Sequence, residues 1–87
     1  MIPVVEGDGF RVWGISWGVG LPALLFTVTY LGPRPVANCR YEAFDADGKS
    51  LGGTNLPDLY PGRPTLTTIF LDSATAEKVA RVKLIAV

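Results

Sequence analysis

The chain has 87 residues, of which 48% are hydrophobic and 18% are charged. This composition excludes a disordered protein, and the length leaves room for one hydrophobic core, so we expect a single domain over residues 1–87. Eight basic and eight acidic side chains cancel, and no run of Lys or Arg is present, which argues against a nucleic-acid or anionic-membrane partner.

The first residues of the chain, 1–6, lack the positive stretch followed by an apolar stretch that defines a secretory signal. A full-length chain of this kind is therefore expected in the cytoplasm. A domain excised from a longer protein is instead expected to be exported or at the cell surface.

The stretch from Val12 to Pro33 has no charged residue. It is longer than the about 20 residues that a helix needs to cross a bilayer. Gly18, Gly20 and Pro22 would interrupt such a helix in the middle. We therefore expect two strands here and no membrane span, which stays as the minor alternative.

The first strong strand pattern covers residues 10–17. Regular alternation places Phe10 and Val12 on one face and Trp13, Ile15 and Trp17 on the other. Two arrangements remain open: the tryptophans belong to the core, or they form an exposed aromatic surface. Since Trp is a characteristic interface anchor, Trp13, Ile15 and Trp17 are our candidate partner-binding residues.

Further strands are predicted over 23–31, 36–44, 49–55, 65–71 and 79–87 from alternation and β-branched content. Asp47-Gly48 predicts a type I′ hairpin turn, and Pro61-Gly62 predicts a type II turn. Only 73–78 is expected to hold a helical turn, with Ser73 as its N-cap.

This pattern predicts an all-β fold, a small antiparallel immunoglobulin-like β-sandwich of six to seven strands, with a small β-barrel as the alternative. The C-terminal strand is expected at a sheet edge. The residues expected in the core are Phe26, Val28, Cys39, Tyr41, Val82 and Leu84.

The segment from Arg34 to Lys49, which ends in Asp45-Ala46-Asp47-Gly48-Lys49, and the later Leu59-Tyr60-Pro61-Gly62 resemble bacterial immunoglobulin-like domains related to the FxLYD family. The resemblance covers about half of the chain. Arg63-Pro64 stands where the family often has an acidic residue, and the family's usual export signal is not seen. The resemblance implies a sandwich that binds a partner or acts as a spacer, and it brings no catalytic residues.

The chain contains no histidine, which removes the usual catalytic triads and His-containing zinc sites. Asp45 and Asp47 lack the remaining ligands of a calcium loop, and Cys39 is expected to be a buried apolar residue without a base beside it. We therefore expect no catalytic, metal-binding or cofactor-binding residues and no enzymatic activity.

The predicted function is a non-catalytic protein-interaction domain that works through an apolar sheet face or an edge strand. It would bind a protein partner, another copy in a homo-oligomer, or both, as a small inhibitor or accessory protein of the kind that phages and mobile elements encode. The alternative is a structural or spacer module of a larger exported or cell-surface protein.

Overall fold

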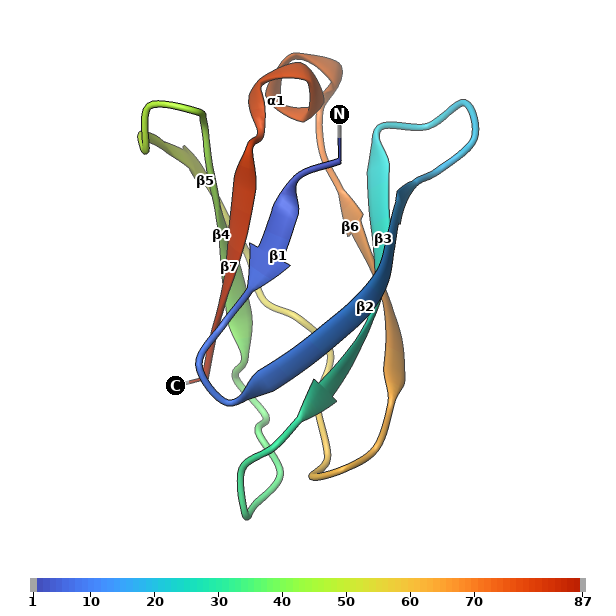
Figure 1. The fold of residues 1–87 in the computed structure, drawn as a ribbon, viewed down its shortest axis with the longest axis vertical. Helices are drawn as coiled ribbons and strands as arrows, with labels where there is room; N and C mark the ends of the chain where they lie inside the picture. The colour runs from blue at the N-terminus through green and yellow to red at the C-terminus, as the bar shows by residue number, and fades with distance from the viewer. Residues whose placement is uncertain (1, 87) are drawn as a thin grey trace.

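Seven strands form two sheets that pack face to face in a computed structural model, which describes residues 2–86 (Figure 1). One sheet has the order β1-β7-β4-β5 and the other has the order β2-β3-β6. The elements are β1 (Val4–Glu6), β2 (Phe10–Trp17), β3 (Ala23–Tyr30), β4 (Arg40–Phe44), β5 (Ser50–Gly52), β6 (Thr65–Phe70), α1 (Ser73–Lys78) and β7 (Arg81–Ile85). The predicted small all-β sandwich is confirmed.

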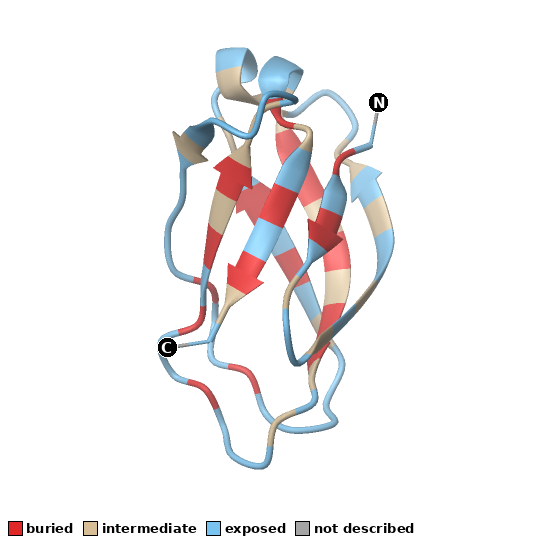
Figure 2. Ribbon diagram, turned by 60° about the vertical axis from the view of Figure 1, so that its left-hand side comes forward, coloured by how far each residue is buried: buried red, intermediate tan, exposed pale blue. Residues whose placement is uncertain are grey.

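The core lies between the two sheets, where alternate residues of each central strand turn inward (Figure 2). All six residues predicted for the core are buried: Phe26, Val28, Cys39, Tyr41, Val82 and Leu84. The long connection between β5 and β6 adds Leu56 and Leu59 to this cluster. The alternation of β3, β4 and β7 was therefore assigned to the correct faces.

The first sheet is mixed, and its edges are β1 and β5. Strand β1 pairs with β7 in parallel, with Val5 opposite Val82, whereas β7 pairs with β4 in antiparallel. The prediction of a wholly antiparallel sandwich is corrected by this pair. The prediction that the C-terminal strand is an edge is also wrong, because β7 lies between β1 and β4. The predicted end of that strand at residue 87 lies outside the described residues.

The two predicted turns have different outcomes. Tyr60 accepts a hydrogen bond from the Arg63 N–H at 3.1 Å and Gly62 has φ of 71°, as a type II turn requires. In the other turn only Gly48 has a positive φ, so the type I′ prediction is wrong. Asp45 instead closes it, since its Oδ1 accepts from the N–H groups of Asp47 and Lys49, each at 2.9 Å.

The predicted helical turn is present as α1, but its N-cap is Asp72 and not Ser73. The Asp72 carboxylate accepts hydrogen bonds from the Thr75 N–H at 2.7 Å and the Thr75 hydroxyl at 2.9 Å. These bonds lower the pKa of Asp72, the backbone bond contributing most. Ser73 lies one position too late for this role, because the cap side chain must reach the N–H three residues on.

The uncharged stretch from Val12 to Pro33 forms most of the β2–β3 hairpin and not a helix. Within residues 2–86, no helix has the length and apolar character that crossing a membrane requires.

Candidate functional site

The acidic and thiol side chains that could bind a metal or act in catalysis do not come together in this fold. Among residues 2–86, no group of three or more His, Cys, Asp and Glu side chains is placed to hold a metal ion. Asp45 closes its own hairpin turn, and Cys39 is fully buried in the core. Burial raises the pKa of the Cys39 thiol, which disfavours the reactive thiolate. The distinctive features of the molecule are therefore on its surfaces.

Strand β2 contains a β-bulge that decides which of its side chains face outward. Up to Trp13 its residues pair with β3 in one register, with Trp13 opposite Thr27. Beyond the bulge Ser16 pairs with Leu25, so β2 has gained one residue relative to β3. Gly14 lies in this irregular segment with φ of 68°, a conformation that glycine adopts without strain. The extra residue reverses the alternation of the strand.

The predicted candidate residues are separated by this bulge. Trp13 lies on the outer face and is 41% exposed. Ile15 and Trp17 are partly buried and pack against the core, together with Phe10 and Val12. The expectation that Trp13, Ile15 and Trp17 share one face is therefore wrong, since a regular period of two does not persist across a bulge. Of the three, Trp13 alone faces outward.

Trp13 is held within a cross-strand row of the β2-β3-β6 sheet. The register places it opposite Thr27, which in turn lies opposite Leu66 of β6. The Arg11 guanidinium carbon lies 5.4 Å from the centre of the indole ring, a cation–π distance. The indole is thus oriented by its neighbours while much of its surface stays exposed to solvent.

Two further exposed apolar side chains lie on the same outer face. Leu66 and Phe70 are each 72% exposed, and they alternate with the buried Thr67 and Ile69 along β6. We define the outer sheet face as Trp13, Leu66 and Phe70 together with the partly buried Leu25 between them. Sequence reasoning did not single out Leu66 or Phe70. The signal was that 65–71 has apolar residues on both of its faces, which does not tell which face is inside.

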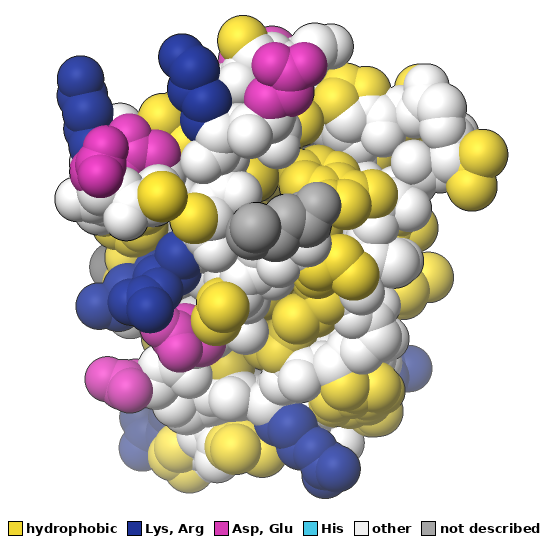
Figure 3. All heavy atoms as spheres, turned by 45° about the horizontal axis from the view of Figure 1, so that its top comes forward, with side chains coloured by type: hydrophobic (Ala, Val, Ile, Leu, Met, Phe, Trp, Pro, Cys, Tyr) yellow, Lys and Arg dark blue, Asp and Glu magenta, His cyan; other side chains and the backbone are white. Residues whose placement is uncertain are grey.

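Charged side chains are concentrated on the other sheet. The strands β2, β3 and β6 contain one charged residue, Arg11, which stacks on Trp13. In Figure 3 most charged side chains lie over the left-hand part of the surface, and hydrophobic side chains dominate the right-hand part. The strands of the first sheet contain five charged residues, namely Glu6, Arg40, Glu42, Arg81 and Lys83.

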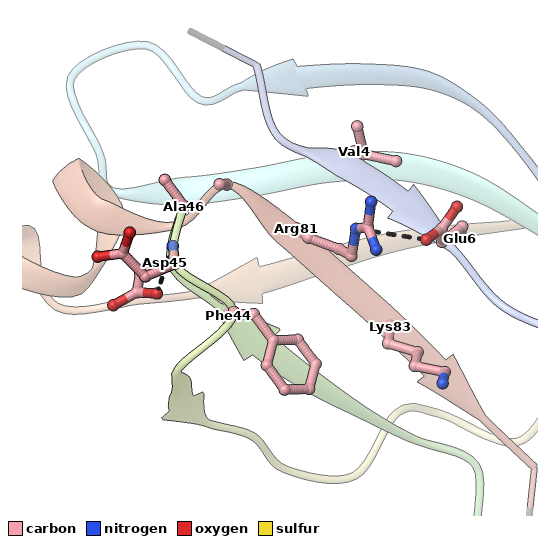
Figure 4. A pocket seen from close by; sticks show the side chains of 10 residues that line it. Val4, Glu6, Phe44, Asp45, Ala46, Arg81 and Lys83 are labelled. Atoms are coloured by element: carbon pink, nitrogen blue, oxygen red, sulfur yellow. Dashed lines mark hydrogen bonds and ion pairs between the residues drawn. The ribbon is translucent and has the colours of Figure 1, made fainter.

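The charged sheet also has a shallow hollow of about 560 Å³ between β1 and the β4–β5 turn (Figure 4). Its floor includes Phe44, Arg81 and Lys83. At one end Glu6 forms an ion pair with Arg81 at 3.4 Å, and at the other Asp45 is engaged by backbone N–H groups. Glu6 and Asp45 are thus already bonded within the chain. This leaves the outer sheet face as the better candidate.

Comparison with known proteins finds no matching family model, no similar curated protein and no similar solved structure. The resemblance to FxLYD-related domains therefore stays a prediction.

Proposed function

We propose that this chain is a non-catalytic protein-interaction domain that binds its partner through the outer sheet face. The observation that carries the proposal is the exposure of Trp13, Leu66 and Phe70 on one nearly uncharged surface. Contiguous exposed apolar surface is typical of protein contacts, and Trp is among the commonest residues that dominate their binding energy. The partner is another protein or a second copy of the chain.

The arrangement of the face supports binding to a flat apolar surface. Trp13 and Leu66 lie in one row across the sheet, and Phe70 lies on the same strand as Leu66, four residues further along. Both side chains of β6 project from a paired strand, so little backbone freedom remains to be lost on binding. Arg11, which lies over the indole ring, supplies one charged group beside this face.

Affinity capture from native lysate with single variants tests the proposal. Trp13→Ala and Phe70→Ser should each lose the captured partner while unfolding at a denaturant concentration close to that of the parent. Val19→Ser is the matched control, because Val19 is fully exposed in the β2–β3 loop and is not one of the residues that define the outer sheet face. Sedimentation at high concentration reports the same loss where the partner is a second copy.

Trp17→Ala separates a binding effect from a folding effect. Because Trp17 packs against the core, its truncation should destabilise the fold by up to about 3–5 kcal/mol, whereas Trp13→Ala should not. The proposal is wrong if the parent captures nothing and sediments as a strict monomer. It is equally wrong if Trp13→Ala and Phe70→Ser capture as much as Val19→Ser does.

A further inference from the structure

Strand β1 is attached to its sheet by a small set of contacts. It pairs with β7 over three residues only, and this is the one parallel pair among the named strands, a geometry slightly less stable per residue. Val5 is its buried side chain, while Val4 and Glu6 face solvent. The ion pair between Glu6 and Arg81 is more than half exposed at both ends, so it adds little. Release of β1 would also expose the buried Pro3 and break the bond from the Val4 N–H to the Ala80 carbonyl oxygen at 3.0 Å, so the whole attachment is one short strand pair with its flanking residue.

The connection from β1 to β2 is a glycine hinge. Residues 7–9 read Gly-Asp-Gly, and the turn is closed by the Phe10 N–H, which donates to the Gly7 carbonyl oxygen at 3.2 Å. Asp8 and Gly9 are exposed, and Gly9 has φ of 81°. Figure 1 shows that the chain changes sheets here, from β1 beside β7 to β2 in the second sheet. Opening the hinge would let β1 extend away from its own body.

Gly7 belongs to the contact between β1 and the edge of β7, which we call the seat of β1, and not to the moving part of the hinge. A Cβ at this position would collide with the carbonyl oxygen of Leu84, so the backbone of Gly7 lies directly against β7. The seat is thus the edge of β7. It accepts one apolar side chain beside Val82, and next to Leu84 it accepts only a residue without a side chain. An occupant needs the sequence of β1 itself: exposed, buried and acidic residues followed by glycine.

We infer that β1 is an exchangeable strand, and that two copies of this chain form a dimer in which each β1 lies along the β7 of the other. The second copy offers the same residues in the same register, so the contacts between β1 and β7 are regained, while the hydrogen bond from the Phe10 N–H to Gly7 that closes the hinge turn is given up. Addition of a strand to the bare edge of β7 supplies the backbone pairing. This surface is separate from the outer sheet face, so the inference does not depend on the proposed function.

Charge reversal across the β1–β7 pair tests the exchange on full-length chains. In the monomer, where β1 pairs with β7 of the same chain, Glu6→Arg alone places two cations side by side at positions 6 and 81. Arg81→Glu alone places two anions there. When these two variants are mixed, exchange restores an opposite-charge pair at both seats at once. The double variant E6R/R81E carries the restored pair within one chain and should behave as the parent does.

The mixture of E6R and R81E chains should contain on the order of tenfold more heterodimer by native mass spectrometry than either chain gives homodimer. The two variants differ in net charge, so the control is a mixture of Glu77→Arg and Arg63→Glu chains. These have the same net charges but are altered at exposed positions outside β1 and β7.

Equal heterodimer in the two mixtures, or monomers only in both, would overturn the inference. A dimer that forms equally in both mixtures and is lost on Phe70→Ser would also overturn it. That last result would place association on the outer sheet face and so support the proposed function. Removal of Asp8 provides an independent measurement, since a hinge too short to close should increase the dimer, and insertion of two glycines there should decrease it.

Discussion

Substitution of Gly14 tests whether the bulge of β2 depends on a left-handed residue. Gly14 has φ of 68°, and an added Cβ would meet no atom within 4 Å, so the cost of Ala here is conformational and not steric. A left-handed conformation costs a residue with a Cβ about 1–2 kcal/mol, partly offset by the lower entropy of the unfolded Ala chain. Gly14→Ala should therefore destabilise the fold by about 1 kcal/mol, which lowers Tm by about 4–8 °C.

Gly18→Ala is the matched control in the same hairpin. Gly18 has no positive φ, and its added Cβ would lie 3.5 Å from the nearest atoms, an ordinary contact distance. Urea unfolding should leave Gly18→Ala close to the parent, while Gly14→Asn should lose less than Gly14→Ala, since Asn tolerates the left-handed region. The reasoning is refuted if Gly14→Ala is as stable as the parent, or if Asn and Ala cost the same.

Two further predictions follow from the pKa shifts. A bulky thiol reagent should modify Cys39 orders of magnitude more slowly in native protein than in denaturant, because the side chain is buried and its raised pKa disfavours the thiolate; equal rates would mean that Cys39 is not in the core. The pKa of Asp72 is lowered, so its contribution to stability is present above the ordinary value of 3.8 and is lost as the pH falls through the folded value. Tm measured from pH 6 to pH 2 should therefore fall more for the parent than for Asp72→Asn, and parallel curves would contradict the cap.

Alternation and turn chemistry were sufficient to place β2 and β3, whereas β4 begins at Arg40 and not at residue 36 as expected. Strand β2 begins and ends where the sequence predicted, and β3 is one residue shorter than expected. The buried residues of β3, β4 and β7 were predicted because each of these strands has one face that is more consistently apolar, and a buried face fixes the register. Pro61-Gly62 was decisive for its turn because that dipeptide matches the backbone angles of a single turn type.

The bulge in β2 could not be predicted from the same evidence. Gly14 interrupts an otherwise continuous pattern, and a lone glycine in a strand is compatible with a bulge, a bend or an ordinary strand position. Only the pairing with β3 shows that one residue is extra. The assignment of Ile15 and Trp17 to the face of Trp13 failed for this reason, and the candidate site moved to residues on β6.

The order of strands in the first sheet was also beyond local patterns. Three residues after Pro3 are too few to show alternation, so β1 was missed and β7 was taken for an edge. A parallel pair between residues 4–6 and residues 81–83 joins the two ends of the sequence, and no turn signal connects them. Such a pair is known only from the three-dimensional arrangement.

At residues 66 and 67, strand β6 has the opposite of the pattern expected for a sheet that faces water. The polar Thr67 is 1% exposed and lies opposite Phe26 inside the sandwich, whereas Leu66 is 72% exposed on the outside. The Thr67 hydroxyl reaches only the Thr65 carbonyl oxygen, at 3.5 Å, which is a weak hydrogen bond.

In an isolated domain, leucine at the buried position and threonine at the exposed one would be more stable. A buried hydroxyl needs a good hydrogen-bond partner, and a leucine side chain contributes hydrophobic stabilisation only when it is buried. The residue of β6 that faces the core beside Phe26 is nevertheless Thr67, and Leu66 and Phe70 lie on the outer sheet face. Apolar residues on the outside of β6 contribute to stability only when another surface covers them. This orientation supports the proposal that a partner binds this face and not the charged sheet.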